Sequence, residues 1–334
     1  MRTAKNNVIY LLKFIAAIFV MLIHTSLFSN ENTLLWQFDA FLRLAIPFFA
    51  VCTGYFLAIK GTSNNYLSNV EPIVKQLFKL IRIYILWTVI YLFVLIPKWI
   101  ETGWFSLMAF VDWGISIFTC GSYFHLWYLL YLIYALLIIM VLFKFLPIKN
   151  YPIFITILYS IEVMQYGYRK FLPESLILIV GIFDKLPCLS SATRILPFVL
   201  LGIYISKQKE ESIYKLITKF GVSFILLVIE RNFLLNSGQI SVSYIMFTLP
   251  TSYYAALIAF KSRKLPYVDT DLSVLGKMST YMYLVHPLVN EIIATIDINS
   301  ELLKFMISAC VSIISAYLLA FAKNKFNRRI RDCE

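Results

Sequence analysis

The sequence has few charged residues, and it lacks the motifs of the common soluble enzyme classes. Only 14% of its 334 residues are charged, whereas 60% are hydrophobic and the mean hydropathy is +0.78. Soluble domains carry about 25% charged residues. The sequence contains no GxSxG, HExxH, GxxxxGK[ST] or GxGxxG motif. This composition excludes an ordinary soluble enzyme and indicates a polytopic membrane protein.

Acidic residues are scarcer than basic ones, 18 against 30, which gives a net charge of +12. The basic residues are spread among hydrophobic runs, so they indicate membrane topology and not a nucleic-acid partner. Metal-binding residues are also few, because the chain has three histidines and five cysteines without CxxC spacing. We therefore expect no metal centre.

Long hydrophobic runs dominate the rest of the chain. Runs of about 17–25 apolar residues fit a bilayer core about 30 Å thick and must be helical there. We predict an all-α bundle in one transmembrane domain, 1–322, with a short basic cytoplasmic tail, 323–334. An interfacial helix is expected at 104–119. The predicted spans are 8–28, 40–59, 78–97, 124–146, 151–167, 192–206, 216–235, 242–260, 278–296 and 302–322.

The loops between these spans predict the orientation. Alternate loops together hold 21 of the 30 basic residues, and the opposite loops hold few. Cytoplasmic loops are enriched in lysine and arginine. Both termini are therefore predicted to be cytoplasmic, which agrees with an even number of spans.

The first span, "YLLKFIAAIFVMLIH", carries Lys13 and His24. Eleven residues of α-helix turn through about 1100° and rise about 16 Å, so the two side chains share one face. One interpretation is that Lys13 extends to the headgroups and His24 is an ordinary interfacial histidine. The other is that both line an aqueous route, since charges within a membrane usually face the bundle interior.

Further ionisable residues lie near the predicted outer ends of other spans. Arg43, His125, Arg194 and Glu230 are at the same predicted level as His24. Each of them alone fits an interfacial residue, whereas together they favour a polar chamber. His286 lies deeper and is followed by Pro287, which is expected to kink its helix. It either makes a hydrogen bond across the kink or lines the route.

Four segments in order, "LLKFIAAIFVMLIH", "IPFFAVCTGYFL", "HLWYLLYLIYALL" and "MSTYMYLVHP", resemble the acyltransferase 3 family of ten-span membrane proteins. Within it, "FLRLAIPFFAVCTGYF", "ATRILPFVLLGIYI" and the glutamate of "VIERNFL" are similar to the membrane domain of vancomycin-resistance serine racemases. Only "AKNKFNRRIRDCE" follows the last predicted span, so we expect no racemase activity.

The resemblance implies a multi-pass protein of the bacterial cell membrane. It implies transfer of an acyl group, commonly acetyl, from cytoplasmic acyl-CoA to an extracytoplasmic envelope acceptor such as a glycan. The family's first span carries an arginine, ten residues and then a histidine. This chain has Lys13, ten residues and His24. Lysine keeps the positive charge but lacks the planar fork that binds phosphate in two places.

The resemblance and the residues together suggest roles. His24 would be the base for the acceptor hydroxyl, oriented by Glu230. Arg43 or Arg194 would stabilise an oxyanion or bind an anionic acceptor. The residues expected to hold the phosphates of the co-substrate, acetyl-CoA, are Lys13, Lys75, Lys79 and Arg82. The remaining residues expected near the substrate are His125 and His286.

Three functions remain open at this point. The first is an integral-membrane O-acyltransferase. The second is a carrier of serine or another small molecule, like the racemase membrane domains, which would move its substrate without acyl chemistry. The third is a structural subunit, for which buried polar residues are an unexplained cost.

Overall fold

The computed structural model describes residues 2–25, 34–60, 70–142, 145–239, 242–261, 271–296 and 298–332. The regular secondary structure within these ranges is helical, without a β-strand. The chain forms two compact units. Unit 1 comprises Met1–Phe49, Glu210–Ile217 and Leu257–Glu334, and unit 2 comprises Ala50–Lys209 and Thr218–Ala256.

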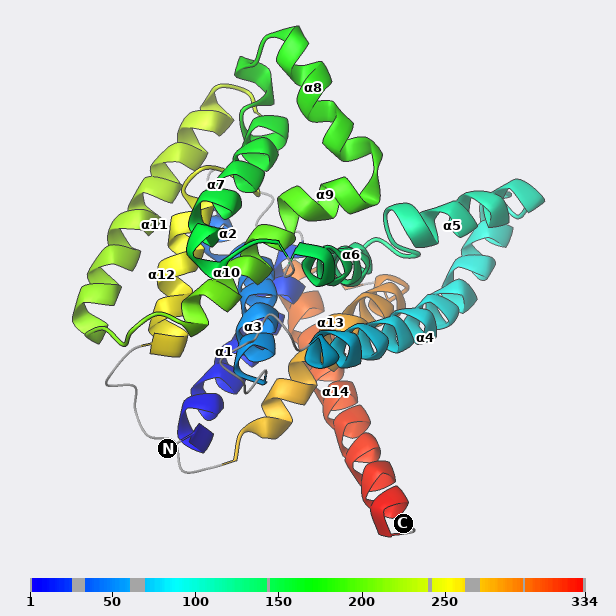
Figure 1. Ribbon diagram of the computed structural model, residues 1–334. Helices are drawn as coiled ribbons and strands as arrows, with labels where there is room; N and C mark the ends of the chain where they lie inside the picture. The colour runs from blue at the N-terminus through cyan, green and yellow to red at the C-terminus, as the bar shows by residue number, and fades with distance from the viewer. Residues whose placement is uncertain are drawn as a thin grey trace. The chain divides into compact units, whose positions relative to one another are not determined.

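Unit 1 is built on three long helices, α1 (Arg2–Ile23), α13 (Ser273–Ala294) and α14 (Glu301–Asp332). The short helix α2 (Leu34–Leu42) and the first residues of α3 (Ala45–Lys60) complete it. Helix α13 packs against both α1 and α14 (Figure 1). Small and flexible side chains let the helices approach closely. The core cluster consists of Ala17, Met21, Met278, Met282, Ala316 and Ala320.

Contacts along α13 give the directions of its neighbours. At its start, the Asn7 amide oxygen of α1 accepts a hydrogen bond from the Leu272 N–H, and farther along His24 stacks on His286. Helices α1 and α13 therefore run parallel. The Ser308 hydroxyl near the start of α14 donates to Asn290 near the end of α13, so these two helices are antiparallel. As a result, the first residues of α1 and the last residues of α14 lie at the same end of unit 1.

Unit 2 surrounds α10 (Leu196–Ser206), which is apolar on every side and almost fully buried. Helices α6 (Trp127–Leu142), α7 (Tyr151–Glu162) and α9 (Pro187–Arg194) pack against α10. The other elements of unit 2 are α4 (Glu71–Glu101), α5 (Leu107–Thr119), α8 (Glu174–Lys185) and parts of α11 (Ile213–Asn236) and α12 (Thr248–Lys261).

The backbones of α3 and α10 touch where two glycines meet. A Cβ added at Gly54 would overlap the Val199 carbonyl oxygen, and one added at Gly202 would overlap the Val51 carbonyl oxygen. The obstacles are backbone atoms, which no rotamer change can move. This contact resembles the small-residue crossings that bring membrane helices close together.

We predict that Gly202→Ala and Gly54→Ala each lower the thermal stability of the purified protein in detergent by several degrees. The added methyl group forces two packed backbones apart, and overpacking typically costs 1–3 kcal/mol. Gly221→Ala is the matched control, because a Cβ at Gly221 meets nothing within 4 Å. Equal melting temperatures for all three variants would show that the crossing is looser than described.

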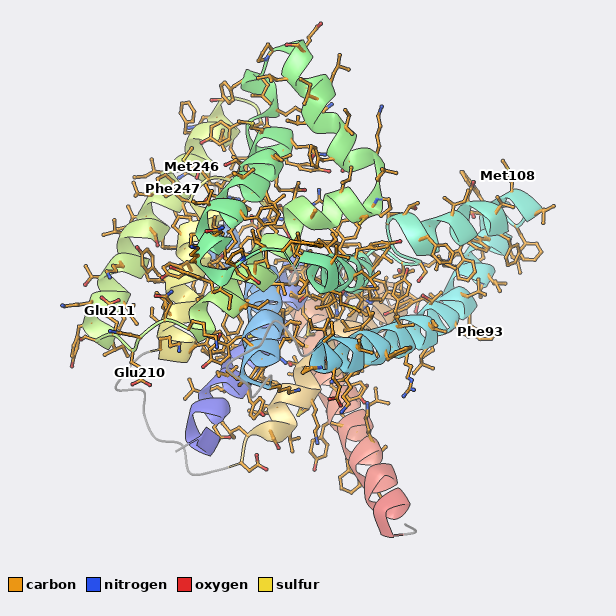
Figure 2. The ribbon with its side chains drawn as sticks, viewed as in Figure 1. Phe93, Met108, Glu210, Glu211, Met246 and Phe247 are labelled. Atoms are coloured by element: carbon orange, nitrogen blue, oxygen red, sulfur yellow. The ribbon has the colours of Figure 1, made fainter. Side chains whose placement is uncertain are left out.

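The outer surfaces of unit 2 are strongly apolar. Figure 2 shows Phe93 on α4 and Met108 on α5, whose side chains are 71% and 67% exposed. Within the part of the chain that the structure describes, three helical stretches are long and apolar enough to cross a membrane: Phe38–Lys60, which runs from α2 into α3, Glu71–Glu101 and Glu301–Lys323. The pair α8 and α9, which meet at a bend of 106°, adds a fourth if it forms one span. Exposed apolar side chains on such helices are those expected to face lipid.

The predicted all-helical fold is confirmed for the described residues, and each predicted span contains a helix. Residues 26–28 of the first predicted span lie outside the described residues. In the eighth predicted span, residues 242–247 precede α12 and are not helical. The predicted span 151–167 ends as an α-helix at Glu162 and continues as the π-helical turn η4 (Val163–Gly167). The ten membrane crossings and the cytoplasmic termini stay predictions.

The region between Gly167 and Pro187 was not predicted as helix, but it contains α8. Pro173 immediately precedes this helix and Pro187 opens α9. Proline favours the first turn of a helix, since its missing N–H would have no partner there. The two prolines therefore mark the beginnings of α8 and α9.

Candidate functional site

The predicted site residues are distributed over both units. Lys13, His24, Arg43 and His286 lie in unit 1. The residues in unit 2 are Lys75, Lys79, Arg82, His125, Arg194 and Glu230. The predicted convergence of all of them on one chamber stays a prediction, and the two groups are described separately.

The structure brings two of the predicted histidines of unit 1 together. The imidazole rings of His24 and His286 are stacked, with centroids 5.4 Å apart and planes inclined by 27°. His24 follows the last residue of α1 and is exposed, whereas His286 is 0% exposed. The prediction that His286 lies deeper in the membrane than His24 stays a prediction.

His286 makes the hydrogen bond that one sequence interpretation predicted. Its Nδ1 lies 3.1 Å from the Met282 carbonyl oxygen, one turn earlier in α13. Pro287, the next residue, has no N–H to donate to the carbonyl four residues before it. The His286 side chain therefore bonds the backbone of α13 in the turn that precedes this proline.

Arg43 lies at the break between α2 and α3. Its Nε forms an ion pair with the Asp39 Oδ2 at 2.6 Å, and the Asp39 side chain is buried. Arg43 thus belongs to the same unit as the stacked pair of His24 and His286.

Lys13 is half-buried on α1, eleven residues before His24. The continuous helix between Lys13 and Ile23 supports the predicted spacing of about 16 Å along one face. The predicted binding of acyl-CoA phosphates by Lys13 stays a prediction.

The predicted phosphate-binding residues of unit 2 share one face of α4. Lys75, Lys79 and Arg82 are spaced by four and three residues and are all exposed. Lys75 also forms an exposed ion pair with Glu71, one turn earlier. The arrangement is a basic stripe at the start of α4, which can attract phosphate groups or lipid headgroups.

His125 of unit 2 is buried among aromatic rings. Its ring centroid lies 4.9 Å from that of Tyr91, 5.5 Å from Phe124 and 5.8 Å from Tyr123, each in an edge arrangement. Aromatic pairs favour this geometry. These contacts fit a histidine that packs inside unit 2, so the predicted role of His125 near a substrate stays a prediction.

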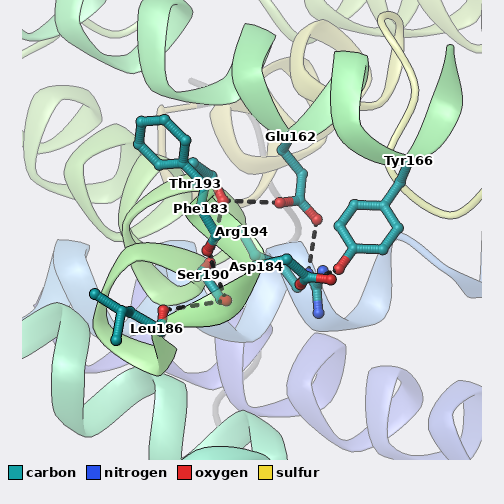
Figure 3. Close-up of polar contacts among 8 residues, drawn as sticks. All are labelled: Glu162, Tyr166, Phe183, Asp184, Leu186, Ser190, Thr193 and Arg194. Atoms are coloured by element: carbon teal, nitrogen blue, oxygen red, sulfur yellow. Dashed lines mark hydrogen bonds and ion pairs between the residues drawn. The ribbon is translucent and has the colours of Figure 1, made fainter. Parts of the chain in front are cut away.

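A charged cluster that the sequence analysis missed joins α7 to α9. Glu162 is 0% exposed, and its Oε1 accepts a hydrogen bond from the Arg194 Nε at 2.7 Å. Its Oε2 accepts one from the Thr193 hydroxyl at 2.8 Å (Figure 3). Thr193 and Arg194 are adjacent in sequence, so they reach both oxygens of one carboxylate. We call Glu162, Thr193 and Arg194 the Glu162–Arg194 cluster.

Aromatic rings surround the arginine of this cluster. The guanidinium carbon of Arg194 lies 4.5 Å from the ring centroid of Tyr166 and 5.8 Å from those of Trp127, Tyr131 and Tyr244. Rings attract a cation over their faces, the more so where water is excluded. The Arg194 side chain is 17% exposed. Because Glu162 balances its charge, the predicted binding of an anionic acceptor by Arg194 has no structural support and stays a prediction.

The sequence contained a signal for Glu162 that was not used. In "YPIFITILYSIEVMQ" it is the only charged residue of a largely apolar predicted span. A carboxylate within a membrane helix is expected to have a specific partner. Only the partner, 32 residues later on another helix, required the structure.

The Glu230 carboxylate accepts hydrogen bonds from backbone groups just before α12. Its Oε1 accepts hydrogen bonds from the Tyr168 hydroxyl and the Met246 N–H, both at 2.7 Å, and its Oε2 accepts one from the Phe247 N–H at 2.8 Å. These N–H groups precede the first turn of α12, where donors lack helical partners. The predicted contact from Glu230 to His24 stays a prediction, since the two residues lie in different units.

Among the described residues, no three of the His, Cys, Asp or Glu side chains are grouped so that they would hold a metal ion. The chemistry available in unit 1 is that of an exposed imidazole, a guanidinium and a cation on the same helix as the imidazole. These groups can accept a proton from a hydroxyl and stabilise developing negative charge.

A relative is similar to nearly the whole chain. It is named an amino-acid racemase, from Enterococcus faecalis, and is 26% identical over 338 residues, which cover 96% of this chain and 47% of the relative. The chain thus spans about half the length of the curated relative it matches. No solved structure matches the chain. The family described as "Acyltransferase domain" matches residues 6–321. The chain therefore belongs to the acyltransferase 3 family.

Proposed function

We propose that this protein is an integral-membrane O-acyltransferase. It moves an acyl group, most simply acetyl, from cytoplasmic acyl-CoA to a hydroxyl of an extracytoplasmic envelope acceptor such as a glycan. The proposal includes ten membrane crossings and cytoplasmic termini in a bacterial cell membrane. The shared position of the α1 start and the α14 end within unit 1 supports termini on one side.

The observation that carries the proposal is the arrangement on α1. Within a chain of this family, an exposed imidazole stands at one end of a helix, stacked on a buried second imidazole, with a lysine about 16 Å earlier on the same face. His24 then acts as the base that takes the proton of the acceptor hydroxyl. That oxygen attacks the thioester carbonyl, and the CoA thiolate leaves toward the cytoplasm. Arg43 would stabilise the negative oxygen of the intermediate.

Inside-out membrane vesicles from cells that produce the protein test this function. Radiolabelled acetyl-CoA is supplied outside, which is the cytoplasmic face, and the native envelope acceptors remain in the lumen. We expect release of CoA thiol together with label in luminal material, and neither in vesicles without the protein. Uptake of radiolabelled serine without CoA release would contradict the proposal and favour the carrier.

Lys13 provides a second prediction from the same geometry. Lys13→Ala is expected to raise the KM for acetyl-CoA about 10-fold with little change in kcat, because a charged hydrogen bond to phosphate contributes about 1.5–3 kcal/mol and lies far from the reacting carbon. Lys13→Arg should restore or lower the KM, since arginine binds phosphate in two places. Steady-state kinetics of CoA release measure both. Unchanged KM in both variants would exclude a phosphate contact at Lys13.

A further inference from the structure

We infer that His286 is a positioning residue for His24. Its ring is held in one orientation and one tautomer, and the His24 imidazole stacks against it, which sets the plane of the proposed catalytic base. This inference rests on the proposed function, because it concerns the base of that reaction. It is drawn from the stacked rings, the carbonyl contact of His286 and the position of Pro287.

The carbonyl contact fixes which nitrogen of His286 carries the proton. A carbonyl oxygen only accepts hydrogen bonds, and the His286 Nδ1 faces the Met282 carbonyl at 3.1 Å. Nδ1 must therefore donate, so a neutral His286 carries its proton on Nδ1 and its lone pair on Nε2. The orientation of the ring is fixed together with its tautomer.

Pro287 makes this arrangement difficult to replace. A helix normally satisfies the carbonyl of residue i−4 through the N–H of residue i, and Pro287 has none. The Tyr283 carbonyl would therefore lack its helical donor within a fully buried segment, where an unsatisfied group costs about 1–3 kcal/mol. In the same turn, the Nδ1–H of His286 donates to the Met282 carbonyl, which ties the ring to the backbone of α13.

His24 needs such a support because of its own position. It lies beyond the last residue of α1, where its backbone N–H bonds back to the Met21 carbonyl in a turn. Because the residue as a whole is exposed, close packing on all sides does not fix its two side-chain torsions. The buried ring 5.4 Å away, inclined by 27°, offers one face against which this imidazole can lie. A base that is displaced by about 1 Å can lose about 10²-fold in rate.

Nuclear magnetic resonance of the full-length protein, labelled with ¹⁵N-histidine in detergent micelles, tests the inference directly. The chain has only three histidines, so His286→Ala and His125→Gln assign all the signals. We expect the Nδ1–H tautomer for His286. We also expect the His24 ring signals to move in His286→Ala but to keep their positions in His125→Gln. A protonated Nε2 in neutral His286, or His24 signals unchanged in His286→Ala, would overturn the inference.

Kinetics separate stacking on the His286 ring from a merely structural hydrogen bond. His286→Phe keeps a flat ring without the donor, and His286→Asn keeps a donor without the ring. We expect kcat for CoA release to fall about 10- to 100-fold in His286→Ala and His286→Asn, with unchanged KM for acetyl-CoA, and to recover partly in His286→Phe. Recovery in His286→Asn but not in His286→Phe would overturn the inference. If the wild-type vesicles transfer no acyl group, the proposed function fails, and the spectra alone decide the positioning of His24.

Discussion

His24→Ala is expected to reduce acyl transfer from acetyl-CoA by about 10²- to 10⁴-fold. General base catalysis by a positioned side chain typically contributes this much, and the alanine variant retains no group that can take the hydroxyl proton. The loss should appear in kcat, because the CoA phosphates bind far from His24 in the proposed geometry. The measurement is the initial rate of CoA release in inside-out vesicles containing equal amounts of each protein.

Thr25→Val is the matched control for this change. Thr25 is adjacent to His24 and its hydroxyl donates to the Leu22 carbonyl at 2.7 Å, so its replacement disturbs the same helix end without removing an imidazole. We expect less than about a tenfold loss in this variant, the scale of one neutral hydrogen bond. If His24→Ala transferred acetyl at the wild-type rate, another group would have to be the base.

Glu162→Gln is expected to destabilise the protein by about 3–5 kcal/mol. It leaves the Arg194 guanidinium without the carboxylate that it faces inside unit 2, and removing one partner of a buried ion pair is strongly unfavourable. Glutamine keeps the size of the side chain and can still accept a bond from Thr193, so the loss reflects charge more than packing. Chemical denaturation in detergent, followed by intrinsic tryptophan fluorescence, measures it.

Two further variants show whether the cost comes from the unpaired charge. Glu71→Gln breaks the exposed pair with Lys75 and should leave the denaturation midpoint unchanged, since surface ion pairs contribute little. Combining Glu162→Gln with Arg194→Gln should recover part of the lost stability, because neither member is then left charged. If the double variant lost at least as much free energy of unfolding as the two single variants lose together, the ion-pair explanation would be contradicted.

Much of the fold followed from hydrophobic runs and helix-breaking residues. The run from residue 8 predicted α1, and Lys13 and His24 were placed on one face because eleven residues complete nearly whole turns. The break at Arg43 and the helix α8 were not predicted. Both depend on short segments whose hydrophobicity does not distinguish one long helix from two short ones.

The contacts that the site residues make with other helices could not be predicted from the sequence, for a different reason. His24 meets His286 and Glu162 meets Arg194 across helices that are distant in the chain. Spacing within one helix fixes which side chains share a face, but it does not determine how two helices are rotated against each other. The glutamate in an apolar span and the proline after His286 did indicate where unusual hydrogen bonds would be needed.

The crossing of α3 and α10 limits how these two helices can move against each other. Main-chain atoms meet at Gly54 and Gly202, so sliding one helix along the other at this point would first have to part the two backbones. Any relative movement of α3 and α10 is therefore least hindered away from the two glycines.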